Sequence, residues 1–87
     1  MKSHDSIVTL GVIANALNRI FYEGDPNKTD FTAKELSIFA KINVHELLND
    51  TGIMEGLMNW DSLGCIHLKI EVNNLIITVL RPDFPEL

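Results

Sequence analysis

Residues 65–80, CIHLKIEVNNLIITVL, decide the fold of this chain. Within 66–72 the even-numbered residues are apolar, and they alternate with polar ones. This period of two is typical of a strand with one buried face. Asn73 and Asn74 follow, and both tolerate the positive φ that a two-residue hairpin turn needs. Because residues 75–80 are again apolar and rich in β-branched side chains, the stretch predicts a β-hairpin.

The turn sets the pairing of the two strands, with Val72 opposite Leu75 and Ile70 opposite Ile77. An isolated hairpin is only marginally stable in water, so its apolar face must be covered. The helical residues that precede the hairpin are the only cover that the chain offers. In this register the face to be covered carries Ile66, Leu68, Ile70, Val72, Leu75, Ile77 and Val79.

The first half of the chain is predicted to be helical. Apolar residues at three- and four-residue spacings predict a helix over residues 6–22, and Gly24 and Pro26 end it. Gly11 interrupts the helix, and we interpret it as a place where another backbone approaches closely. Residues 23–29 form a polar loop.

Two shorter helices are predicted to follow this loop. Thr32 and Glu35 form a capping box at the start of the second helix. Asn43 caps a third helix, which Gly52 ends. The apolar group at residues 53–60 predicts either a short fourth helix or an irregular extension of the third.

No repeat or linker interrupts the chain, so we expect a single domain over residues 1–87, with an ordered core at 6–81 and a short tail at 82–87. Its class is α+β, with three to four helices before the C-terminal hairpin. Among small folds this order resembles the winged helix, in which a wing follows a helix-turn-helix. The resemblance implies a small strand between the first two helices, for which only residues 30–32 qualify.

Composition restricts the class of partner and the compartment. The net charge is −5 and the pI is about 4.9, so the chain gains little from binding a polyanion or an anionic membrane. Cys65 is the only cysteine, which excludes an intrachain disulfide. No apolar run is long enough for a membrane span, and the N-terminus is a poor signal peptide. We therefore expect a cytoplasmic protein.

The loop at residues 25–35 resembles the calcium-binding loop of an EF-hand, because oxygen side chains alternate and an acidic residue follows inside the next helix. It is one residue short, it lacks the turn glycine, and Pro26 stands among the ligand positions. We interpret it as a capped, solvated loop and expect no calcium there.

The remaining candidate ligands and nucleophiles do not form a recognisable site. His4, His45, His67 and Cys65 lack the spacing of a metal site. Cys65 and His67 would face the same side of a strand, but no loop that could stabilise an oxyanion accompanies them. No nucleophile elbow or phosphate-binding glycine loop occurs. We therefore expect no catalytic, metal-binding or cofactor-binding residue and no enzyme activity.

The winged-helix resemblance makes residues 43–61 the neighbourhood of the recognition segment. This stretch has no Lys or Arg and carries four acidic residues. Contact with phosphates and base edges needs basic and amide side chains, so nucleic-acid binding by the chain alone is not expected. The alternative is a winged-helix DNA-binding transcriptional regulator whose weak basic surface works only in a dimer.

Four apolar side chains are candidates for contact with another protein chain. Met58 and Trp60 belong to an apolar group that is either a flexible binding surface or core, and we expect the indole N–H of Trp60 to reach water or a carbonyl. Ile76 and Leu80 point away from the core in the predicted register, in a strand whose edge is free. Either a second chain covers them, or the first helix or the tail at 82–87 does.

These observations predict a non-enzymatic protein–protein interaction or regulatory module without cofactor or metal. Its partner is another protein chain, and a second copy of the same chain is one possibility.

Overall fold

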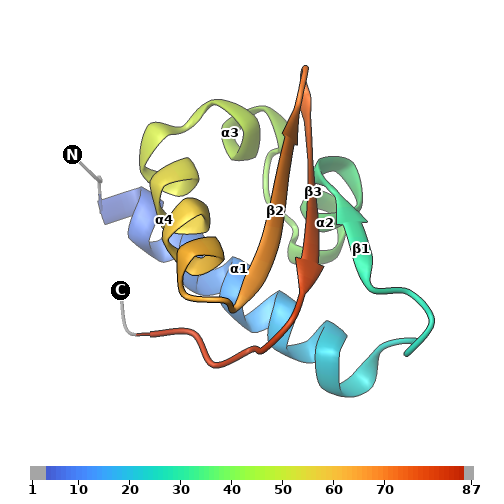
Figure 1. Cartoon of the computed structure of the whole chain (residues 1–87). Coiled ribbons are helices and arrows are strands. Elements are labelled where there is room, and N and C mark those ends of the chain that lie inside the picture. Colours follow the sequence, from blue (N-terminus) through green and yellow to red (C-terminus); the bar gives the residue numbers. More distant parts are fainter. Residues whose placement is uncertain (1–3, 86–87) are drawn as a thin grey trace.

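The structure is a computed structural model that describes residues 4–85, with side chains described from residue 6 onward. The chain is α+β: helices come first, and a three-stranded antiparallel sheet with a C-terminal hairpin completes the domain (Figure 1). The helices cover one side of the sheet. The elements are α1 His4–Glu23, β1 Asp30–Thr32, α2 Ala33–Ala40, α3 Val44–Asn49, α4 Thr51–Ser62, β2 Ile66–Glu71 and β3 Asn74–Val79.

The strand order is β1-β3-β2, so β3 is the central strand. The three residues of β1 form a short strand between α1 and α2, at the residues that the sequence offered for one. Phe31 lies opposite Ile77, and Asp30 lies opposite Thr78. The Thr78 hydroxyl donates to the Asp30 carboxylate at 2.6 Å, which ties β1 to β3. The prediction that the second hairpin strand has a free edge is therefore wrong.

The hairpin turn lies one residue earlier than predicted. Val72 and Asn73 form the two-residue loop, and Asn73 has the positive φ, at 54°. Asn74 lies in β3 opposite Glu71, so Ile70 faces Leu75 rather than Ile77. The predicted register is wrong by two positions on the partner strand. The predicted faces are nevertheless correct, because a shift of two residues keeps every side chain on its own side.

A contact outside the hairpin explains why Asn74 is not in the turn. Its side-chain oxygen accepts a hydrogen bond from the backbone N–H of Ala33, at 3.3 Å. Ala33 is the first residue of α2, where a helix leaves N–H groups without internal partners. Asn74 therefore connects the hairpin to α2, and this long-range bond selects one of two similar asparagines as the strand residue.

The core fills the space between the helices and the inward face of the sheet. Ile66, Leu75 and Ile77 are fully buried on that face. The prediction that the whole inward face is covered is wrong at the hairpin tip, where Ile70 is 57% exposed and Val72 is 93% exposed. The helices contribute the fully buried side chains Leu10, Ile13, Leu17, Leu36, Leu47, Ile53, Leu57 and Trp60.

The predicted starts of the second and third helices are confirmed, whereas the first helix starts at His4, before the predicted residue 6, and one predicted end is wrong. Thr32 and Glu35 form the capping box of α2, and Asn43 caps α3. Asp50, not Gly52, ends α3, and the same Asp50 caps α4. Gly52 lies inside α4 at a point where a side chain does not fit, because a Cβ there would meet the Ser6 side chain of α1 at 2.7 Å.

Gly11 does not mark a close backbone approach, because a Cβ added there would meet nothing within 4 Å. The close approach is at Gly56, where a Cβ would overlap the Leu10 side chain. Small residues on α4, not on α1, therefore set the distance between these two helices.

The two asparagines of the hairpin should respond differently to glycine. Asn74→Gly removes the bond to Ala33 and puts glycine into a strand, so we expect it to lower the free energy of unfolding by roughly 1–2 kcal/mol. Asn73→Gly places glycine at a positive φ, so it should change that free energy by no more than about 0.5 kcal/mol. Urea unfolding of both variants measures the difference. Equal losses in the two variants would contradict the observed turn.

Candidate interaction surfaces

A part-buried hydroxyl–carboxylate contact fixes the start of α4. The Ser6 hydroxyl of α1 donates to the Asp50 carboxylate at 2.9 Å, and the backbone N–H of Ile53 donates to the same carboxylate at 3.1 Å. These bonds favour the ionised form. They lower the pKa of Asp50 below its ordinary value, with the Ile53 N–H the larger cause and the Ser6 hydroxyl the second. Asp50 therefore caps α4 and holds it against α1.

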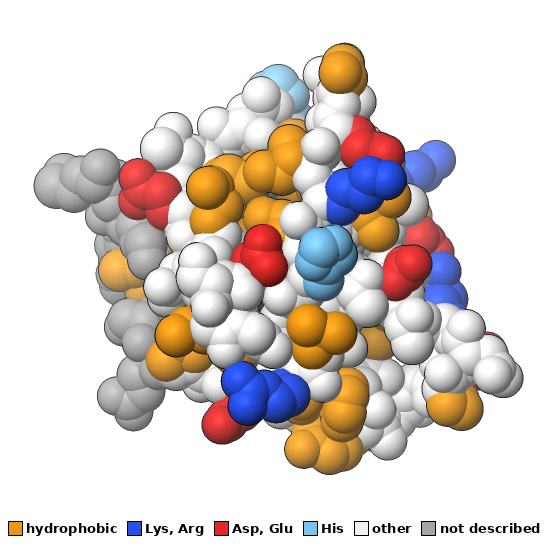
Figure 2. Space-filling model, viewed as in Figure 1, with side chains coloured by type: hydrophobic (Ala, Val, Ile, Leu, Met, Phe, Trp, Pro, Cys, Tyr) orange, Lys and Arg blue, Asp and Glu red, His pale blue; other side chains and the backbone are white. Residues whose placement is uncertain are grey.

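An apolar surface lies where α4 meets β2. Met54 and Met58 are one turn apart on α4, and Leu68 and Ile70 lie on the inward face of β2, which packs against α4. Met54 and Leu68 are half-buried, whereas Met58 is 52% exposed. Figure 2 shows hydrophobic side chains gathered over α4 and the adjoining half of β2. We call these four residues the α4–hairpin patch.

The surroundings of the α4–hairpin patch are acidic. No Lys or Arg occurs between Lys41 and Lys69, whereas Glu55 and Asp61 lie on α4 beside the patch. The Lys69 ammonium lies 3.7 Å from the Glu71 carboxylate, which offsets its charge. This surface can form apolar contacts with a protein, and flexible methionine side chains suit such contacts. Phosphate binding would bring negative charge next to carboxylates.

Met58 was predicted to be a contact residue, and it is exposed within the patch. Ile70 and Leu68 were assigned to the core. Sequence pattern places these residues on the inward face but does not say how far the helices cover it.

Trp60 lies in the core and is fully buried. Its ring packs against Phe84 of the tail, with the ring centroids 4.6 Å apart. Its indole Nε1 is buried, and within the described part of the chain it has no hydrogen-bond acceptor. The expected carbonyl partner for this N–H is therefore not found among the described residues. Trp60 cannot contact a partner unless the tail moves.

Ile76 and Leu80 lie on the outward face of the sheet. Ile76 lies between Thr32 of β1 and Lys69 of β2, which leaves it half-buried. Leu80 follows β3 and is 48% exposed. Neighbouring strands flank Ile76 on both sides. Residues 86–87, the end of the predicted covering tail, lie outside the described residues.

The loop before α2 uses its polar groups internally. The Asp25 carboxylate accepts from the backbone N–H of Asn27 at 2.9 Å. The Lys28 ammonium binds the Glu35 carboxylate at 2.6 Å, and the N–H of Thr32 donates to the same carboxylate. The Lys28 contact, followed by the Thr32 N–H, lowers the pKa of Glu35. Glu35, the last candidate calcium ligand of this loop, thus serves as the capping residue of α2.

Cys65 and His67 lie in different environments, contrary to the expectation that they share one side of a strand. Cys65 is buried and its Sγ lies 3.5 Å from the Asp83 carbonyl, whereas His67 is exposed. The side chain of His4 lies outside the described residues. Among the described residues, no three His, Cys, Asp or Glu side chains are close enough to hold a metal ion.

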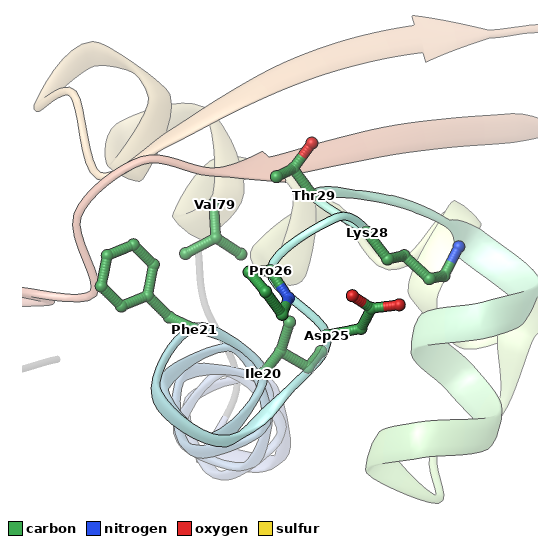
Figure 3. A pocket seen from close by; sticks show the side chains of 7 residues that line it. All are labelled: Ile20, Phe21, Asp25, Pro26, Lys28, Thr29 and Val79. Atoms are coloured by element: carbon green, nitrogen blue, oxygen red, sulfur yellow. The ribbon is translucent and has the colours of Figure 1, made fainter.

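Three adjoining depressions follow one flank of α1, and we call them together the α1 groove. The first, of about 270 Å³, lies below the end of β3, where Figure 3 shows Val79 above Ile20, between Phe21 and Pro26. The second, of about 300 Å³, shares Ile20 with the first. The third, of about 240 Å³, continues between α1 and the end of α2.

The sequence pattern does not reveal this groove. Phe39 lies near the end of α2, where its ring is 40% exposed and lines two of the depressions. Arg19 lies over this ring, 5.1 Å from its centroid. The groove arises from the packing of α1 against α2, which no local pattern specifies.

Comparison with known proteins gives no match: no family model, no curated protein and no solved structure is similar enough to the chain. Among the helices of residues 4–85, none is long and apolar enough to cross a bilayer. The function must therefore be inferred from the surfaces of the chain itself.

The Ser6–Asp50 contact should make stability depend on pH. Because the pKa of Asp50 is lowered by folding, the contact stabilises the fold above the ordinary pKa, about 4, and this stabilisation is lost as the pH falls through the folded value. Ser6→Ala should lower the urea midpoint of unfolding at pH 7. Between about pH 5 and 3 the midpoint of this variant should then fall less than that of the wild type.

Ser37→Ala is the matched control, because its buried hydroxyl donates to the Lys34 carbonyl and not to a carboxylate. Ser37→Ala should lower the urea midpoint by the same amount at every pH in this range. If Ser6→Ala and the wild type lose the same stability on acidification, the Asp50 carboxylate does not act through Ser6.

Proposed function

We propose that this protein is a non-enzymatic protein-interaction or regulatory module of the cytoplasm, built on a winged-helix-like scaffold. Two features support the scaffold. The elements follow the order helix, short strand, helices and hairpin, and the short strand β1 pairs with the second strand of the hairpin. This support is an analogy of fold, so the function itself must be argued from the surface.

The α4–hairpin patch carries the proposal. In a winged helix that reads DNA, the helix before the hairpin supplies the contacts to base edges, and α4 holds that position here. Its outward residues include Met58, Glu55 and Asn59, and none of them is basic. An exposed apolar surface with acidic neighbours favours contact with a protein, whose apolar side chains could cover Met58 and Ile70.

A second copy of the chain is one partner that the proposal allows. Leu80 is exposed and Ile76 is half-buried on the outward sheet face, and two such faces could meet about a twofold axis. The apolar area at these two residues is small. We therefore place the main contact on the α4–hairpin patch, which holds four apolar side chains.

The alternative is a winged-helix DNA-binding regulator, and only the order of the elements favours it. The two basic side chains of the hairpin region already have partners. Lys69 is paired with Glu71, and the Arg81 guanidinium donates to the Leu63 carbonyl at 3.0 Å. Neither is free to neutralise a phosphate without losing a contact within the protein.

Affinity capture with the immobilised full chain, followed by reconstitution with the purified partner, tests the proposal. We expect Ile70→Lys to weaken the reconstituted complex at least about tenfold, since it puts a charge into an apolar contact. Leu80→Lys is the matched control, because it adds the same charge at a similarly exposed site on the other face, and it should change the affinity less than about threefold.

Circular dichroism must show that both variants are folded. A complex that is unaffected by Ile70→Lys but lost with Leu80→Lys would move the interface to the outward sheet face. A chain that forms no reconstituted complex with any captured protein would overturn the proposed function.

A further inference from the structure

The α1 groove is a second surface with the features of a binding site. It follows α1 from Val12 to Glu23, which at 1.5 Å per residue is a length of about 16 Å. The three depressions share lining residues, so they are continuous: Ile20 joins the first two, and Arg19 with Phe39 joins the last two. Such a length accommodates about three turns of a helix.

The groove has an apolar lining at its α2 end. Val12 and Phe39 are partly exposed there, and the small side chains of Ala16 and Ala40 leave room between them. Val8, one turn before Val12 on α1, is more exposed still and extends the apolar surface beyond the groove. Apolar side chains of a ligand would therefore find contacts along most of this length.

Charge is distributed unevenly along the groove. Arg19 and Lys41 line the depression at the α2 end, and no acidic residue lines it. Among the described residues, neither cation lies within ion-pair distance of a carboxylate. The other two depressions carry both signs of charge, because Glu23 and Asp25 line them together with Lys28, which is paired with Glu35. In a chain with a net charge of −5, two cations without a carboxylate partner beside an apolar lining are complementary to an acidic ligand.

We propose that the α1 groove docks an amphipathic, acidic helix of a partner protein. Aliphatic side chains of this helix, at three- and four-residue spacings, lie on Val12, Ala16 and Phe39. Its acidic side chains face Arg19 and Lys41. The site is separate from the α4–hairpin patch, so it gives the module a second contact and does not depend on the function proposed for the first.

A peptide-display library of amphipathic helices tests this proposal with the full chain as bait. The helices are about 14 residues long, and their polar positions vary freely among acidic, basic and neutral residues. We expect the enriched peptides to be acidic and aliphatic. We expect the double variant Arg19→Glu/Lys41→Glu to bind the enriched peptides at least about tenfold more weakly than wild type, as measured by fluorescence anisotropy.

The matched control is Lys34→Glu/Lys69→Glu, which makes the same change in net charge at two exposed lysines outside the groove. It should bind the peptides within about threefold of wild type, and both variants should keep the far-ultraviolet circular dichroism of the wild type. A third variant, Val12→Lys, places a charge in the apolar lining and leaves Arg19 and Lys41 in place. It should also weaken binding of the enriched peptides.

Three results would overturn the proposal. The library could yield no enriched helix, or its enriched helices could be neutral or basic. The two charge-reversed variants could weaken binding equally, which would show a long-range effect of net charge. Sedimentation could show that the wild type self-associates and that Arg19→Glu/Lys41→Glu is monomeric, which would make a second copy the occupant of the groove.

Discussion

The structure depends on covering the inward face of a single central strand. β3 has β1 on one edge and β2 on the other, and its inward residues Leu75 and Ile77 are fully buried. Burying each of these side chains is worth roughly 1.5–3 kcal/mol, so the helices must lie on this side of the sheet. The Ser6–Asp50 contact and the close approach at Gly56 then set how α1 and α4 form that cover.

The same constraint creates the surface on which the proposed function relies. The helices cover the sheet near the base of the hairpin and leave its tip open, so Ile70 and Val72 remain exposed. Met58 on α4 lies at the margin of this cover. The exposed patch is therefore not a defect of the core. It is the part of the inward face that this arrangement of helices does not reach, and a partner protein could complete its burial.

Sequence pattern predicted most of the fold, because helix spacing, caps and strand alternation are local signals. The class, the helix starts at Thr32 and Asn43, and the two faces of the hairpin are confirmed. The turn could not be predicted, because Asn73 and Asn74 tolerate the same backbone conformations and a distant N–H decides between them. The end of α3 was predicted wrongly for a similar reason. Gly52 resembles a helix end in the sequence, but it is glycine at a point where α1 leaves no room for a side chain.

The candidate surfaces were less predictable than the fold. Trp60 is of a residue type that often forms contacts with partners, but the tail residue Phe84 packs against its ring. Phe39 has the spacing of a core residue, but α1 leaves its ring exposed beside Arg19. In both cases exposure is set by elements distant in sequence. Charge is different, because the absence of Lys and Arg between Lys41 and Lys69 is visible in the sequence and holds for any fold.

Because of this absence of cations, a DNA titration distinguishes a protein-binding scaffold from a DNA-binding one. The full chain should be titrated against a labelled random-sequence duplex of about 20 base pairs at physiological salt, with fluorescence anisotropy as the readout. We expect a Kd no tighter than about 10⁻⁴ M, the weak end of non-specific DNA binding. A sub-micromolar Kd that rises steeply with added salt would show that the chain neutralises several phosphates, and it would contradict the central claim that this scaffold contacts proteins.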